Sequence, residues 1–140
     1  MSKILTIFTD GGARGNPGPA AIGFVVKDEA GKVLAREGKY IGETTNNVAE
    51  YTAVIEALRW LLVNSINPVS LVNFYLDSKL VVCQLNGLYK IKKGHLRELV
   101  IRVRKLEKDL GIKTSYQLLP REKNYDADFL VNKTLNQKNP

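Results

Sequence analysis

The sequence predicts an α/β fold in which a five-stranded mixed sheet, with its first three strands antiparallel, carries helices on both faces. Three observations predict it. Three strand-like segments come first and are joined by short connections. Helical and strand-like segments then alternate, so that the full order is β-β-β-α-β-α-α-β-α. A hairpin-connected group followed by βα units forms a mixed sheet with helices packed on it.

The first three strands are expected at Lys3–Thr9, Ala20–Lys27 and Val33–Ile41, which are rich in apolar residues. The segment Asp28–Gly31 joins the second strand to the third and ends in glycine. A short connection of this kind is typical of a β-hairpin. We therefore expect these strands to pair in antiparallel fashion.

The first helix is expected at Asn47–Asn64, where apolar residues recur every three or four positions. The dipeptide Asn67-Pro68 ends it, because proline does not continue a helix. Leu71–Leu76 follows as the fourth strand.

The rest of the chain predicts a short helix, an amphipathic helix, a strand and a closing helix, at Ser78–Asn86, His95–Leu110, Lys113–Leu119 and Asp126–Leu135. Ser78 is a suitable N-cap for the short helix. Without internal repeats or a linker, residues 1–135 are expected to form one domain. Residues 136–140, rich in amide side chains, are expected to form a flexible tail.

The composition is that of an ordinary globular chain, with 140 residues, 44% hydrophobic content and a net charge of +7. No stretch is long and apolar enough to cross a membrane, and the N-terminus lacks a signal-peptide cleavage pattern. The single cysteine, Cys83, fits a reducing, cytoplasmic setting. The whole basic excess lies in the second half and is concentrated in Lys90–Lys108, which indicates a polyanionic partner or a solvated helix face.

Four acids fall at element ends that face one edge of the predicted sheet. Asp10 closes the first strand and Asp77 closes the fourth, while Glu50 and Asp128 lie in first turns of helices. Each also has an ordinary explanation: turn formation for Asp10, helix capping for Asp77, a capping box with Asn47 for Glu50, and the helix dipole for Asp128. Four such acids at one edge are harder to explain separately.

Clustered carboxylates repel one another unless cations neutralise them, and their hard oxygens suit Mg²⁺ or Mn²⁺. Two such ions roughly 3.5–4 Å apart clamp the attacking and leaving oxygens of a phosphodiester. The cluster, together with a basic surface, therefore predicts metal-dependent phosphodiester chemistry on a nucleic acid.

From near its N-terminus to about Asn132, the chain resembles the type 1 ribonuclease H family. Four blocks carry the resemblance: TDGGARGNPGPAAIGFVV, TTNNVAEYTAVIEAL, YLDSKLVVCQLNG and REKNYDADFLVN. The first two are specific together, and the last two occur in the family's order. The resemblance implies the ribonuclease H-like fold, with helices on both faces of the sheet.

The resemblance also implies a catalytic and metal-binding tetrad of Asp10, Glu50, Asp77 and Asp128. Asp126 is the alternative for the fourth place. Asp128 is preferred because the family places this acid after alanine and before an apolar residue and leucine, as in ADFL.

The activity implied is that of an endoribonuclease. It hydrolyses the RNA strand of RNA–DNA hybrids with two Mg²⁺ ions, leaving 5′-phosphate and 3′-hydroxyl ends. Mn²⁺ is expected as a substitute metal. We expect a monomer, without membrane association, that removes RNA from hybrids in replication and repair. Secondary activity on duplex RNA stays open, because the two duplexes share minor-groove shape and 2′-hydroxyls.

Six residues are expected to bind the substrate, by resemblance: Gly11, Gly12, Asn16, Thr45, Asn46 and Asn47. The two glycines would let the backbone approach the sugar edge of a strand. The asparagine amides suit 2′-hydroxyls and base edges, and Thr45 matches a position that binds a DNA-strand phosphate. The alternative for the glycines and asparagines is plain turn chemistry.

The chain departs from the family pattern in the loop before the last acid, where many cellular relatives carry a histidine. Leu118–Tyr125 has none, and the single histidine, His95, is expected to serve as a solvated helix start. Arg121, Glu122 and Lys123 are the candidates to replace it, with Arg121 first.

The second departure is the missing basic helix that some bacterial relatives insert between the second and third helices. Lys90, Lys92 and Lys93 are expected to supply a reduced version that binds substrate. No hybrid-binding domain is expected either, so affinity and processivity should be low. The alternative functions are a non-catalytic nucleic-acid-binding module and a transposase or integrase core.

Overall fold

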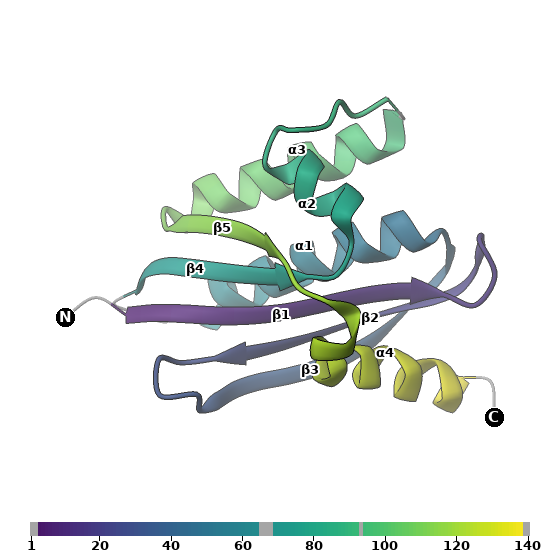
Figure 1. Cartoon of the computed structure of the whole chain (residues 1–140), viewed down its shortest axis with the longest axis horizontal. Coiled ribbons are helices and arrows are strands. Elements are labelled where there is room, and N and C mark those ends of the chain that lie inside the picture. The colour runs from purple at the N-terminus through teal and green to yellow at the C-terminus, as the bar shows by residue number, and fades with distance from the viewer. Residues whose placement is uncertain (1–2, 65–68, 93, 139–140) are drawn as a thin grey trace.

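The sheet has five strands in the order β3-β2-β1-β4-β5 (Figure 1). A computed structural model describes residues 3–64, 69–92 and 94–138 of the chain. The strands are β1 (Lys3–Ala13), β2 (Gly18–Lys27), β3 (Val33–Thr44), β4 (Val69–Leu76) and β5 (Lys113–Leu118). The first three pair antiparallel, and β4 joins β1 and β5 in parallel. The predicted mixed sheet is confirmed.

Helices cover both faces of this sheet. They are α1 (Asn46–Asn64), α2 (Lys79–Leu85), α3 (Gly94–Leu110) and α4 (Tyr125–Lys138), with a short 3₁₀ turn, η1 (Arg121–Lys123). α1 and α3 pack together on one face, and α4 lies alone on the other, across β1, β2 and β3 (Figure 1). Among the residues that the structure describes, no helix has both the length and the apolar character that a membrane crossing requires.

The core lies between the sheet and α1. Alternate residues of the strands, such as Ile7, Ile22 and Phe74, point to this side and are buried. α1 contributes apolar residues from several sides, including Tyr51 and Leu58, because α3 covers its outer surface. Each large side chain of this kind contributes roughly 1.5–3 kcal/mol through burial.

A second, smaller cluster forms under α4, where Val131 and Leu135 pack on Ala21. The helix lies directly on the backbone of β2 at Gly23, since a Cβ there would come within 2.6 Å of the carbonyl oxygen of Ala127. Gly23 pairs with Asp10 across the β1–β2 ladder. This close packing places the first turns of α4 at the end of β1.

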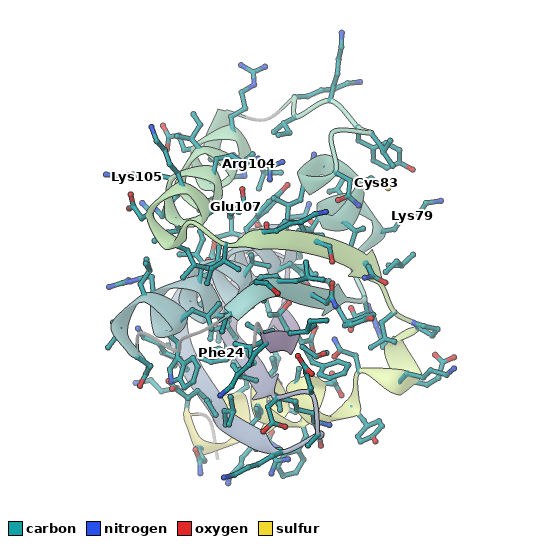
Figure 2. The ribbon with its side chains drawn as sticks, turned by 90° about the vertical axis from the view of Figure 1, so that its left-hand side faces the viewer. Phe24, Lys79, Cys83, Arg104, Lys105 and Glu107 are labelled. Carbon is teal, nitrogen blue, oxygen red and sulfur yellow. The ribbon has the colours of Figure 1, made fainter. Side chains whose placement is uncertain are left out.

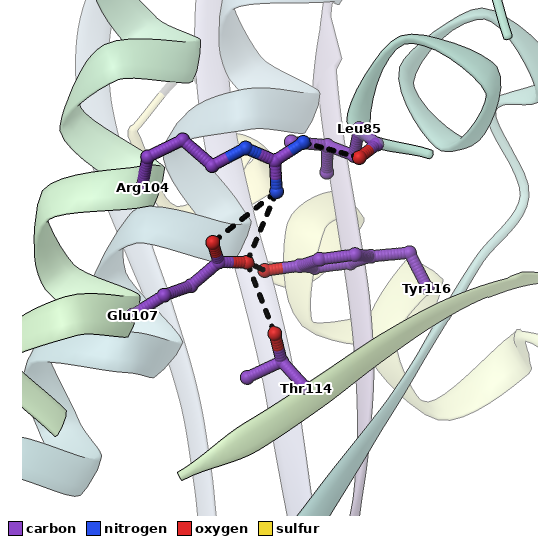
Figure 3. A network of polar contacts seen from close by, with 5 residues as sticks. All are labelled: Leu85, Arg104, Glu107, Thr114 and Tyr116. Carbon is purple, nitrogen blue, oxygen red and sulfur yellow. Dashed lines mark hydrogen bonds and ion pairs between the residues drawn. The ribbon is translucent and has the colours of Figure 1, made fainter. Parts of the chain in front are cut away.

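A polar network joins α3 to β5 and to the end of α2 (Figures 2 and 3). The carboxylate of Glu107 accepts hydrogen bonds from the Tyr116 hydroxyl at 2.6 Å and from Thr114 at 3.0 Å. Arg104 donates to Glu107 at 3.2 Å and also to the carbonyl oxygen of Leu85. Burial, and then the bond to Glu107, raise the pKa of Tyr116. The network fixes the framework behind α2.

Several boundaries differ from those expected. β1 continues to Ala13 and β3 to Thr44, because ladder hydrogen bonds with β2 extend beyond the apolar segments. α4 continues to Lys138, three residues past the predicted end. The predicted helix break at Asn67-Pro68 lies outside the described residues.

Candidate active site

Three of the predicted acids meet at one edge of the sheet. Asp10 lies on β1, Asp77 directly follows β4, and Glu50 comes from α1. One carboxylate oxygen from each forms a group whose members all lie within 4.8 Å of one another. β1 and β4 are parallel neighbours, so their carboxyl ends bring Asp10 and Asp77 together although 67 positions separate them.

Gly11 explains how Glu50 reaches this group. A Cβ at Gly11 would collide with the backbone carbonyl of Ala49. Only glycine therefore lets α1 dock against β1 at this height. The sequence analysis expected the missing side chain of Gly11 to let substrate approach the backbone. In the structure, α1 fills the space that a Gly11 side chain would need. The sequence carried no signal for this contact.

The alternative explanation of Glu50, a capping box with Asn47, is excluded. α1 begins one residue earlier than expected, and Thr45 caps it, accepting a hydrogen bond from the Val48 amide at 3.3 Å. Glu50 therefore lies beyond the capping position and points to Asp10. Helix capping is likewise excluded for Asp77, because Ser78 caps α2 by accepting from the Val81 amide.

Asp128 lines the same cavity as the other three acids, from the first turn of α4. It is close enough to Asp10 to raise the pKa of that carboxyl, although it stands outside the tight three-carboxylate group. Asp126 instead faces Arg36, with 3.8 Å between their charged atoms. The geometry thus favours Asp128 over Asp126 as the fourth acid.

Asn124 is a site residue that the sequence reasoning missed. The residue is 1% exposed, and Nδ2 donates to the carbonyl oxygen of Thr9 at 2.8 Å and to Asp77 Oδ2 at 3.0 Å. One amide thus joins β1, the end of β4 and the start of α4. Its place in the last block of the resemblance was visible, but its partners were not.

The carboxylates destabilise one another's charges. Burial, followed by the charge of Asp77, raises the pKa of Asp10 to about 7. Burial and the Asp10 charge raise the pKa of Glu50 well above its usual value, and the Gly11 amide only partly opposes this. Among the described residues, Glu50 Oε2 has no hydrogen-bond partner. Buried, repelling, under-bonded carboxylate oxygens fit a divalent cation, which would neutralise the cluster.

The cavity around the acids has a volume of about 490 Å³. Four of the six residues predicted to bind substrate by resemblance line it: Gly11, Gly12, Asn46 and Asn47. The other two, Asn16 and Thr45, hold its rim. Asn16 Oδ1 accepts from the Asn46 amide at 3.0 Å, and Asn46 Oδ1 accepts from the Ala13 amide at 2.8 Å.

Basic side chains surround the acids. Arg121 lines the cavity from η1, together with Lys79 and Arg14, two cations that the sequence reasoning did not select. Lys90 and Lys92 line a neighbouring groove, which Asn47 shares with the acidic cavity. Lys93 lies outside the described residues.

Comparison with known proteins shows what the chain as a whole is similar to. The family model described as "Reverse transcriptase-like" matches residues 8–134. The chain is 38% identical over 128 residues to "Ribonuclease HI" of Halobacterium salinarum, covering 91% of this chain and 62% of that protein. It is equally similar to "Bifunctional protein Rv2228c" of Mycobacterium tuberculosis, of which it spans 34%. The chain thus covers less than two thirds of these relatives.

A solved structure covers the chain more fully. The crystal structure of LC11-RNase H1, a protein isolated from compost, was determined in complex with an RNA/DNA hybrid. It superimposes with a TM-score of 0.90 at 42% identity, over 96% of this chain and 98% of that one. The fold is that of a ribonuclease H-like protein. The chain belongs to the type 1 ribonuclease H family.

Proposed function

We propose that the chain is a metal-dependent endoribonuclease that hydrolyses the RNA strand of RNA–DNA hybrids, leaving 5′-phosphate and 3′-hydroxyl ends. The carboxylate group of Asp10, Glu50 and Asp77 supports this most strongly. Its oxygens lie within 4.8 Å of one another beside a cavity that also contains Asp128. The bound hybrid in LC11-RNase H1 supports the substrate class.

The four acids are proposed to hold two Mg²⁺ ions, with Mn²⁺ as a substitute. When bound, such ions supply charge neutralisation and a nucleophilic water for in-line displacement. Asp10 is the central acid of the group, because it contacts Glu50 and its pKa is raised by the charges of both Asp77 and Asp128. Asn124 keeps Asp77 directed toward the group through its 3.0 Å hydrogen bond.

The rim is proposed to position the duplex. Gly11, Gly12, Asn46 and Asn47 present backbone and amide groups to the cavity, and Asn16 fixes Asn46. Such groups suit the 2′-hydroxyls and base edges of a shallow minor groove. Thr45 is proposed to contact a phosphate of the DNA strand, and its hydroxyl also accepts a hydrogen bond from the Val48 amide.

The neighbouring groove, which two lysines line, is proposed to bind the duplex backbone. Lys90 and Lys92 lie on it, and Asn47 connects it to the acidic cavity. The sequence analysis assigned the same role to Lys93, and that assignment stays part of the proposal. Arg121 is proposed to aid turnover from the cavity edge. Unchanged steady-state turnover of Arg121→Ala would contradict that assignment.

One experiment tests the function. RNA–DNA hybrid, duplex RNA and duplex DNA of one sequence are incubated with the protein in Mg²⁺, in Mn²⁺ and with chelator. We expect cleavage of the hybrid's RNA strand in either metal and none with chelator. Preferential cleavage of DNA, or metal-independent cleavage, would contradict the proposal. Cutting of duplex RNA would add a second substrate. Size-exclusion chromatography tests the proposed monomer.

A further inference from the structure

Arg14 is an exposed cation of the acidic cavity, and its side chain has three hydrogen-bond acceptors among the described residues. It follows the last residue of β1 and lines the cavity that holds the four acids. Its Nη2 donates to Asn136 Oδ1 at 2.6 Å and lies 3.5 Å from both the carbonyl and the side-chain oxygen of Asn132. All three acceptors belong to α4, so the guanidinium spans from the β1–β2 turn to that helix.

The partners of Arg14 are neutral, which leaves its charge available. Within the described ranges, no carboxylate oxygen lies within 4.0 Å of its guanidinium. A guanidinium has five N–H donors, and among the described residues Arg14 uses only Nη2 for side-chain hydrogen bonds. Nε and Nη1 therefore remain free to contact an anion. A guanidinium that already formed an ion pair with a carboxylate would have lost most of its ability to bind an anion.

The backbone of Arg14 is also fixed. Its amide donates to the Pro19 carbonyl at 2.8 Å, closing the turn between β1 and β2. Gly18 packs against the Arg14 carbonyl so closely that a Cβ would collide with it. With the backbone and one end of the guanidinium both held, little conformational entropy remains to be lost when a ligand binds.

From this arrangement we propose that Arg14 is a phosphate-binding residue for the strand that enters the acidic cavity. Asn132 and Asn136 orient its guanidinium. This inference rests on the proposed function and adds a contact to it. The bound group is a phosphodiester of the cleaved strand close to the scissile position, because Arg14 and Asp128 line one cavity. A bidentate guanidinium suits this ligand better than an ammonium would.

Binding of an RNA–DNA hybrid, measured by fluorescence anisotropy across about 50–200 mM salt, tests the proposal. All variants carry Asp10→Asn, so that the hybrid stays intact. Arg14→Ala should weaken binding roughly 5- to 20-fold and lower the slope of log K against log salt by about 0.9. Arg14→Lys should restore the slope but only part of the affinity, since lysine keeps the charge without the planar fork.

Two α4 variants separate this role from a structural one. Asn136→Ala should weaken binding roughly threefold at an unchanged slope, because orientation is lost while the charge stays. Lys133 is an exposed lysine that does not line the acidic cavity, so Lys133→Ala is the matched charge control. It should bind the hybrid with the same affinity and salt slope as the Asp10→Asn protein.

The outcomes distinguish the two claims. If the Asp10→Asn protein fails to bind hybrid, the proposed function falls, and the Arg14 assignment with it. If it binds and Arg14→Ala keeps the same salt slope, the Arg14 assignment alone is wrong. Equal losses of hybrid affinity in Lys133→Ala and Arg14→Ala would also overturn the Arg14 assignment, because any surface cation would then contribute as much to binding.

Discussion

Asn124 Nδ2 lies 3.0 Å from Asp77 Oδ2, so an amide just before the last helix holds an acid that follows the fourth strand. The same nitrogen donates to the Thr9 carbonyl at 2.8 Å. This residue therefore serves both the framework and the site, and its replacement should have two separable effects.

We expect Asn124→Ala to lower kcat on RNA–DNA hybrid roughly 10- to 100-fold, since a hydrogen bond to a charged group is worth about 1.5–3 kcal/mol. It should also lower the free energy of unfolding by about 1–3 kcal/mol, because the Thr9 carbonyl loses its side-chain donor. Asn86→Ala is the control, since Asn86 donates to the Tyr116 carbonyl at 3.0 Å away from the acids. A kcat equal to the parent's would contradict the positioning role.

The acidic group predicts a stability that falls with rising pH in metal-free protein. The pKa of Asp10 is raised from 3.8 to about 7, so the folded state holds a proton that the unfolded state releases between these values. Stability is therefore greatest at low pH within this window and is lost as the pH rises through about 7.

Thermal unfolding in chelator checks this sign. The parent's Tm should drop between about pH 5 and 8, whereas Asp10→Asn should show a smaller drop and a higher Tm than the parent at pH 8. Adding Mg²⁺ at pH 8 should stabilise the parent more than the variant. A parent whose Tm rises over this range would contradict the assigned direction.

Gly11→Ala should destabilise the fold strongly. The new Cβ would overlap the Ala49 carbonyl, and α1 would have to move away from β1. We expect a loss of about 3 kcal/mol or more in the free energy of unfolding, measured by urea denaturation. At Gly12 a Cβ would lie 3.7 Å from Val131 Cγ1, an ordinary contact, so Gly12→Ala should cost under about 1 kcal/mol.

The network of Figure 3 predicts a variant that changes stability without changing chemistry. Tyr116→Phe removes the 2.6 Å bond to Glu107 and should cost about 1–3 kcal/mol in unfolding free energy. Cleavage kinetics should stay within twofold or so, because Tyr116 lies outside the acidic cavity. Tyr125→Phe, at a residue that is 67% exposed, is the neutral control.

The sequence was sufficient for features that depend on local pattern. Apolar segments, turn signals and helical spacing located the strands and α-helices that the structure describes. The positions of Asp10 and Asp77 at the ends of apolar segments predicted that these two acids would meet. The sequence analysis placed the end of β1 too early. Pairing with β2 extends this strand past its apolar residues into a glycine-rich segment.

Features that depend on partners distant in sequence were not predictable in this way. The contact of Gly11 with Ala49, the double role of Asn124 and the anchoring of Arg14 each require knowing what lies opposite. Local reasoning assigned such residues to turns or left them unselected. The preference for Asp128 over Asp126 came from the resemblance, and the ion pair of Asp126 with Arg36 now supports it physically.

The seating of α4 on Gly23 has a consequence for the order in which the protein matures. Three of the acids lie within the first 77 residues, but Asp128 enters the cavity only after α4 has settled on the sheet. During synthesis on the ribosome, the emerging polypeptide therefore carries an incomplete set of acids until its closing helix is free to dock. The four-acid cavity is thus complete only when the last helix is packed on the sheet.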